Sequence, residues 1–206
     1  GKYSPLKPGW YDRTRGKGNM DYSPGYRMFS FLTDNLAPKQ FNPMGYNPLE
    51  KILNLLIDFD ELQRIQPPKL FVCATNVMNC ETRIFGPKEI TSKTLLASAC
   101  LPYLFPAVEI NGEYFWDGGY MGNPPIFPLI ENTPDTNDIV LVQINPFQIK
   151  KVPESIEEIR DRVNEISFNS SLYLELKTIE LHRKLAREGK NDKKYLEVFL
   201  HRICGD

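Results

Sequence analysis

An aspartate followed by two glycines is the feature of this sequence best suited to chemistry. Asp117 comes directly after the strand-like segment Tyr114–Trp116, so we expect its carboxylate at the end of a strand. Gly118 and Gly119 let the backbone adopt a positive φ and let a substrate approach closely. Asn123 stands in a rigid Gly-Asn-Pro-Pro stretch and is expected to shape the same loop. The carboxylate could act as a general base, although Asp-Gly is also a common turn dipeptide and a simple turn is the alternative.

A carboxylate base needs a serine or a water molecule to act on. The chain has nine serines, and none has glycine at both −2 and +2, so the G-x-S-x-G motif is absent. Ser23 lies in a Tyr-Ser-Pro-Gly turn, and Ser98 lies on an apolar helix, where its hydroxyl is expected to bond to the preceding turn. His182 and His201 stand among charged residues and are expected at the surface, which argues against a Ser-His-Asp triad. A serine activated directly by aspartate needs no histidine.

Composition excludes several other classes of protein. The 206 residues are 41% hydrophobic and 25% charged, as in ordinary globular domains, and the net charge of −1 gives no indication of a nucleic-acid partner. The longest apolar stretch, Leu95–Ile110, is interrupted by two prolines, so we expect no transmembrane helix. The four cysteines lack metal-ligand spacing, so we expect no metal and no cofactor. Cys73 and Cys100 are expected to be buried free thiols, which favours a reducing, cytoplasmic location.

The segments that must position Asp117 alternate between strands and helices. The expected strands are Leu70–Ala74, Thr82–Phe85, Val108–Ile110, Tyr114–Trp116, Ile139–Ile144 and Tyr195–Ile203. The expected helices are Tyr26–Leu36, Pro48–Leu56, Thr91–Ala99 and a long segment from the capping box at Ser155 to Glu188. This alternation predicts an α/β domain.

Two details refine this expectation. Asn111-Gly112 is a strong signal for a two-residue hairpin turn between two of the strands. The long C-terminal helix is expected to break at Phe168–Ser171, because a single helix of this length is unusual in a globular protein. Residues 1–48 hold 12 of the 30 glycines and prolines, which predicts a long loop with short helices.

Several runs of residues resemble the bacterial patatin-like phospholipases. The runs that carry the resemblance are Leu95–Pro102, Phe105–Gly112 and Tyr114–Pro124, with Phe71–Asn76, Arg83–Phe85 and Val142–Pro146 as further parts. Asn164–Ser171 is similar to a C-terminal extension found in one branch of the family. The resemblance covers nearly the whole chain after about Tyr22, and the context of Asp-Gly-Gly is its most specific part.

The resemblance implies a three-layer α/β/α sandwich, incomplete here, that hydrolyses phospholipid or a related acyl ester with a Ser–Asp dyad. Asp117 matches the family's general base. The family's oxyanion loop and G-x-S-x-G elbow precede the region that matches this chain, so both are missing and the chain alone is expected to be inactive. We therefore expect residues 1–147 to form the C-terminal part of a hydrolase core, and residues 148–206 to form a helical extension packed on it.

Two other classes stay open at this stage. The chain could be a non-catalytic interaction module that kept the fold, and a G-x-S-x-G motif upstream would decide against that reading. It could also be a hydrolase that activates water, which would require a second carboxylate or a metal near Asp117. The sequence leaves open the lipid or acyl-ester substrate, peripheral contact with a membrane, and the oligomeric state.

Overall fold

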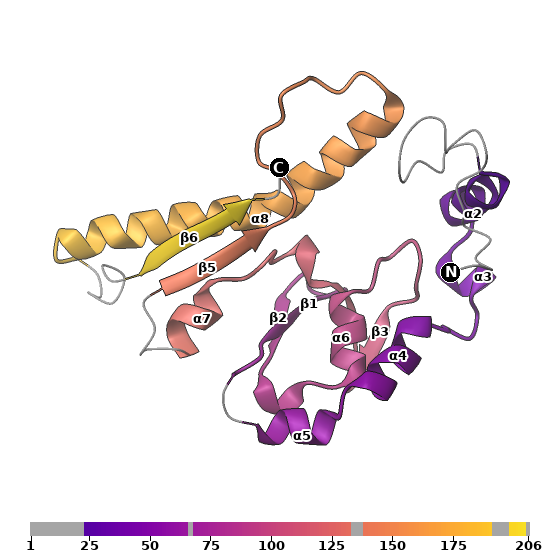
Figure 1. Cartoon of the computed structure of the whole chain (residues 1–206), viewed down its shortest axis with the longest axis horizontal. Helices are drawn as coiled ribbons and strands as arrows, with labels where there is room; N and C mark the ends of the chain where they lie inside the picture. The colour runs from indigo at the N-terminus through magenta and orange to yellow at the C-terminus, as the bar shows by residue number, and fades with distance from the viewer. Residues whose placement is uncertain (1–22, 66–67, 133–137, 191–197, 205–206) are drawn as a thin grey trace.

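The computed structural model describes residues 23–65, 68–132, 138–190 and 198–204. Within them, helices accompany one four-stranded and one two-stranded sheet, which confirms the predicted α/β class (Figure 1). The arrangement of these layers as an incomplete three-layer α/β/α sandwich stays a prediction, as does the division of the chain near residue 147. None of the described helices is both long and apolar enough to cross a membrane.

Four helices occupy the first third of the described chain. They are α2 (Pro24–Asn35), α3 (Pro38–Phe41), α4 (Pro48–Leu56) and α5 (Phe59–Arg64). The helices predicted near the first and third of these are confirmed. Asn47 caps α4 as its sequence suggests, because its side-chain oxygen accepts the N–H of Leu49. The predicted loop character of residues 1–22 lies outside the described residues.

The four-stranded antiparallel sheet has the order β2-β1-β4-β3. Its strands are β1 (Val72–Asn76), β2 (Thr82–Phe85), β3 (Val108–Ile110) and β4 (Glu113–Asp117), followed along the chain by the 3-10 turn η2 (Gly118–Tyr120). After β2, the 3-10 turn η1 (Pro87–Glu89) leads to α6 (Ser92–Ser98), which begins at the cap Thr91. The buried core of this layer comprises Ala74, Phe85, Ile90, Ala97 and Phe115.

Local signals located all four strands of this sheet, although the bounds of two differ from the prediction: β4 is one residue longer at each end than Tyr114–Trp116, and β1 is shifted. The predicted turn is confirmed, since Asn111 and Gly112 adopt φ values of 54° and 84° between β3 and β4. The strand predicted at Leu70–Ala74 instead covers Val72–Asn76. The reason is that Leu70 is 40% exposed, whereas Asn76 is buried and pairs with β4.

The second sheet is a parallel pair joined through a long helix. Strands β5 (Asp138–Gln143) and β6 (Phe199–Cys204) run side by side, and α8 (Ile156–Arg187) lies along them (Figure 1). The short helix α7 (Phe127–Asn132) precedes β5. The buried core of this layer joins α8 to β5, to α7 and the residue before it, and to the residue before β6: Ile126, Ile130, Leu141, Leu172, Ile179, Ala186 and Val198.

The predicted break in α8 is wrong, because the helix runs unbroken for 32 residues. The side chain of Asn169 makes tertiary contacts: its Nδ2 donates to the carbonyl oxygens of Asn145 and Pro146. Such contacts remove the competition with the helix that polar side chains otherwise offer. The predicted capping box at Ser155 is confirmed, and the helix ends before Gly189, which adopts a positive φ of 72°.

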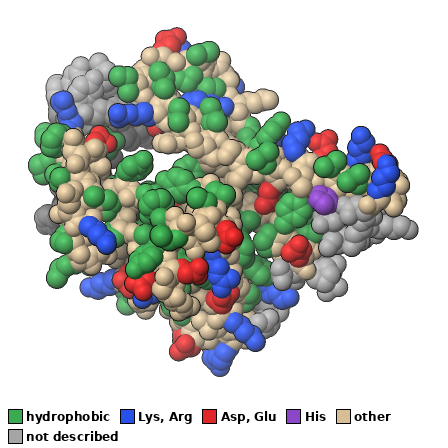
Figure 2. Space-filling view, turned by 180° about the vertical axis from the view of Figure 1, so that it is seen from behind, with side chains coloured by type: hydrophobic (Ala, Val, Ile, Leu, Met, Phe, Trp, Pro, Cys, Tyr) green, Lys and Arg blue, Asp and Glu red, His purple; other side chains and the backbone are tan. Residues whose placement is uncertain are grey.

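Strand β5 is covered on one face only. Leu141 is 5% exposed and packs toward α8, whereas Val140 and Val142 are 60% and 67% exposed. The strand predicted at Ile139–Ile144 is shifted by one residue: β5 begins at Asp138, and Ile144 lies beyond its end. The last strand is Phe199–Cys204, later than predicted; Tyr195 lies outside the described residues. Figure 2 shows the molecule from behind, with basic side chains at the C-terminal end of α8 and hydrophobic side chains gathered near the centre of the view.

Candidate functional site

Asp117 is the last residue of β4, and its backbone is held from two sides. Its N–H donates to the carbonyl oxygen of Cys100, 2.9 Å away, just after α6. Its own carbonyl oxygen accepts the hydroxyl of Thr75 at 2.9 Å, and the residue pairs with Ala74 of β1. The position of Asp117 at a strand end, as expected from the sequence, is thus fixed by both neighbouring elements.

The carboxylate of Asp117 is half-buried and has one oxygen engaged. Oδ1 accepts the N–H of Gly119 at 2.8 Å, so the side chain caps η2. Among the described residues, no other group donates a hydrogen bond to this carboxylate. Burial raises the pKa of Asp117, and the bond from Gly119 offsets part of that rise. The group is therefore a stronger base than a surface aspartate.

The two glycines after Asp117 are required by close packing and not by backbone conformation. A Cβ on Gly118 would fall within 3.0 Å of the carbonyl oxygen and Sγ of Cys73. A Cβ on Gly119 would fall within 3.0 Å of the Phe168 ring on α8. Neither glycine adopts a positive φ, so that part of the expectation is wrong. The glycines allow β1 and α8 to approach the loop directly.

Asn123 links the same loop to α8. Its backbone N–H donates to Oγ of Ser171 at 3.2 Å, and its Nδ2 donates to the carbonyl oxygen of Phe168 at 3.1 Å. Both contacts hold the loop in place, and both point away from the open solvent toward the helix. A contact of Asn123 with substrate stays a prediction.

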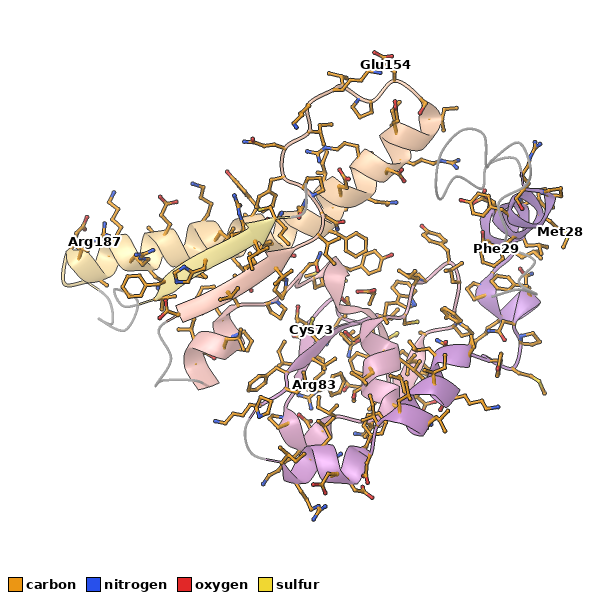
Figure 3. The ribbon with its side chains drawn as sticks, in the orientation of Figure 1. Met28, Phe29, Cys73, Arg83, Glu154 and Arg187 are labelled. Atoms are coloured by element: carbon orange, nitrogen blue, oxygen red, sulfur yellow. The ribbon has the colours of Figure 1, made fainter. Side chains whose placement is uncertain are left out.

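Two thiols lie close to Asp117. Sγ of Cys73 approaches the carbonyl oxygen of Gly122 at 3.4 Å, and Figure 3 shows Cys73 near the centre of the molecule. Burial, together with the negative charge of Asp117, raises the pKa of Cys73 and of Cys100 to about 11. Both thiols are therefore protonated at neutral pH, which makes them poor nucleophiles.

No serine of the described chain is a partner of the Asp117 carboxylate. Ser98 is the last residue of α6, and Ser23 is buried at the N-cap of α2. The nearby acid–base inventory is thus the carboxylate, two protonated thiols and the phenol of Tyr120, whose pKa is raised by burial and by the charge of Asp117. It contains a base, and the described residues supply no nucleophile to it.

The histidines lie away from Asp117, in the second sheet and its helix. His182 is half-buried on α8, with its ring 5.9 Å from that of Phe127, so the prediction of a surface position is wrong for it. His201 is exposed as predicted and lies 2.7 Å from Asp138 on the neighbouring strand. No serine among the residues that the structure describes bonds to this exposed pair.

A cavity of about 360 Å³ opens at the other end of β4. It is lined by Glu113, at the start of the strand, and by the ion pair of Arg83 with Glu89. Asp117 does not line it. Phe85, Ile110 and Phe115 line it as well, so the hollow has a mixed polar and apolar character.

A family model described as patatin-like phospholipase matches residues 9–130. The matched stretch contains the whole four-stranded sheet, α6 and Asp117. The chain belongs to the patatin-like phospholipase family. This membership assigns it to a family of lipid acyl hydrolases and confirms the resemblance drawn from the sequence. Comparison with curated protein sequences gives no match.

The residues of α8 that contact the loop after Asp117 were not identified from the sequence. Phe168, Ser171 and Glu175 lie three and four residues apart and therefore share one face of the helix. That spacing was the available signal, but Phe168–Ser171 was interpreted as a helix break. The helix also lies beyond the residues that the family model matches.

Proposed function

We propose that this chain is the C-terminal part of a lipid acyl hydrolase in which Asp117 is the general base of a Ser–Asp dyad. The nucleophilic serine would lie outside these 206 residues. The observation that carries the proposal is the Asp117 carboxylate, which ends a strand of the matched region with one oxygen bound by Gly119 and the other unbonded among the described residues. The absence of G-x-S-x-G from the chain supports an external nucleophile.

The geometry supports a simple division of roles. Gly119 holds Oδ1, so Oδ2 is available to accept the proton of the serine hydroxyl as its oxygen bonds to the ester carbonyl carbon. The same proton then passes to the departing alcohol as the carbon–oxygen bond of the ester breaks. Asp117 next takes a proton from water as the water oxygen bonds to the carbonyl carbon of the acyl-enzyme. It returns that proton to the serine oxygen as the bond between this oxygen and the carbonyl carbon breaks and the fatty acid leaves. A pKa raised by burial favours both proton acceptances, because it brings the basicity of the group closer to the operating pH.

Replacing Asp117 by asparagine tests this proposal. In a protein that carries both this chain and the nucleophile, Asp117→Asn should lower turnover of an acyl ester by on the order of 10²-fold or more, because the amide cannot accept the proton. The amide oxygen can still accept the N–H of Gly119, so folding should be intact. Asp138→Asn is the matched control: Asp138 is an exposed aspartate at the start of β5, and its replacement should leave turnover unchanged. Wild-type turnover in Asp117→Asn would remove this residue from the mechanism.

A non-catalytic interaction module is the alternative, and one observation favours it. Large apolar side chains are exposed on β5, where Val140 and Val142 lie on the face opposite α8. Exposed apolar patches often mark contact surfaces. The two functions differ in their need for Asp117: a module that only binds a partner should keep its affinity in Asp117→Asn.

A further inference from the structure

One face of α8 meets the loop that begins at Asp117. Phe168, Ser171, Leu172 and Glu175 are spaced three and four residues apart, so they point in the same direction from the helix. Leu172 is 1% exposed and belongs to the same buried cluster as Ile126, in the segment just before α7. The apolar contact fixes α8 against this segment, and the other three residues act on the loop itself.

Phe168 presses on the residue that orients the Asp117 carboxylate. Its ring lies so close to Gly119 that a single added carbon there would clash. The ring also packs against Tyr120, with centroids 5.2 Å apart and an angle of 42° between the planes. Because the N–H of Gly119 is the donor to Oδ1 of Asp117, Phe168 limits the movement of that donor.

Ser171 and Glu175 satisfy backbone donors farther along the same loop. Oγ of Ser171 accepts the N–H of Asn123, and Oε2 of Glu175 accepts the N–H of Ile126 at 2.5 Å. Burial raises the pKa of Glu175, and hydrogen bonds from the backbone of Ile126 and Phe127 offset part of that rise. A half-buried carboxylate is costly, and here it replaces water as the partner of two loop amides.

We propose that α8 is a positioning element of the Asp117 site, in which Phe168, Ser171 and Glu175 hold residues 119–127 and thereby keep the Gly119 N–H directed at the Asp117 carboxylate. The catalytic role of this arrangement rests on the proposed function, but the contacts by which α8 holds residues 119–127 do not. The helix lies outside the residues matched by the family model, so a segment beyond the family's own pattern completes the environment of its base.

The Gly119 amide provides a direct readout of this link. We would follow its NMR resonance through a pH titration of Asp117, and measure its hydrogen exchange, in the wild-type chain, Phe168→Ala, Phe168→Leu and Ser171→Ala. Phe168→Ala should accelerate exchange of the Gly119 amide by about tenfold or more and reduce its response to Asp117 ionisation, because the donor gains freedom. Ser171→Ala should act in the same direction with a smaller effect, and Phe168→Leu should recover part of the wild-type behaviour. Leu174→Ala is the matched control, since this side chain is 64% exposed on the same helix and should change neither quantity.

Folded Phe168→Ala with wild-type exchange and titration at Gly119 would overturn the proposal. If that variant does not fold, Ser171→Ala decides the matter, and unchanged behaviour of Gly119 in it would overturn the proposal equally. These measurements do not use turnover. A failure of Asp117→Asn to reduce turnover would therefore remove the proposed function. The link between α8 and Gly119 is tested separately, by hydrogen exchange and titration of the Gly119 amide.

Discussion

Asp117 is held in the folded chain at a cost to stability. Its carboxylate is half-buried, burial raises its pKa, and the N–H of Gly119 compensates only in part. The folded state therefore binds this proton more tightly than the unfolded state, so ionisation of Asp117 opposes folding. Groups perturbed in this way are concentrated at functional sites, where chemistry and stability have different requirements.

Because of this cost, the difference in stability between Asp117→Asn and the wild type should depend on pH. Well below the ordinary pKa of 3.8 both proteins are uncharged at this position and their melting temperatures should be similar. As the pH rises from that value through the raised folded pKa, the wild type should lose stability relative to the variant, and the difference should then stay constant. Thermal melts between about pH 3 and pH 7 measure this, with Asp161→Asn as control, because Asp161 is exposed on α8. A variant that melts below the wild type at neutral pH would contradict the desolvation argument.

At the scale of elements, α8 connects the second sheet to the loop that follows the first. It covers one face of β5 and β6 and also reaches η2, next to the first sheet. Its stability comes from the packing of one face, because long surface helices gain little from propensity alone. A substitution on that face should therefore lower the free energy of unfolding far more than a substitution on the opposite face.

Two leucines of α8 test this difference. Leu172 is 1% exposed and Leu174 is 64% exposed, two residues apart on the same helix. Leu172→Ala should lower the free energy of unfolding by about 2–5 kcal/mol through loss of burial and a residual cavity. Leu174→Ala should change it by no more than about 0.5 kcal/mol. Urea denaturation measures both values, and equal effects would refute the assignment of the buried face.

The elements that could be predicted from sequence are those whose signals are local. The Asn111-Gly112 turn, the cap at Asn47 and the capping box at Ser155 each depend on neighbouring residues, and each was located correctly. The continuity of α8 could not be predicted, because it depends on Asn169 reaching carbonyl oxygens more than twenty residues earlier in the chain. For the same reason Asp117 was found from its glycines, whereas its distant neighbour Phe168 was not.

At the scale of the whole molecule, one face of the parallel pair of β5 and β6 exposes large apolar side chains. Val140 and Val142 of β5 are more than half exposed, and so is Ile203 opposite them on β6. Parallel sheets normally have both faces covered, so apolar side chains in this position favour association. The chain should therefore bind something over this face, whether a second copy or the segment that carries the nucleophile.

We expect the isolated chain to self-associate in a concentration-dependent way. Val142→Lys places a charge in the middle of the exposed face and should shift the population toward monomer, as sedimentation velocity would show. Val163→Lys is the control, because Val163 is also exposed, at 56%, but lies on α8. A compact wild-type monomer at high concentration would argue against an exposed contact face.

Labelling with a fluorophosphonate probe shows whether Asp117 activates a serine outside this chain, because such a probe reacts only with a serine activated by a nearby base. We expect the 206-residue chain not to be labelled, since no described serine contacts Asp117. We also expect a protein combining this chain with the external nucleophile to be labelled at that serine, and Asp117→Ala to abolish this labelling. Stoichiometric labelling of Ser23 or Ser98 in the chain alone would contradict the account and place the nucleophile within these residues.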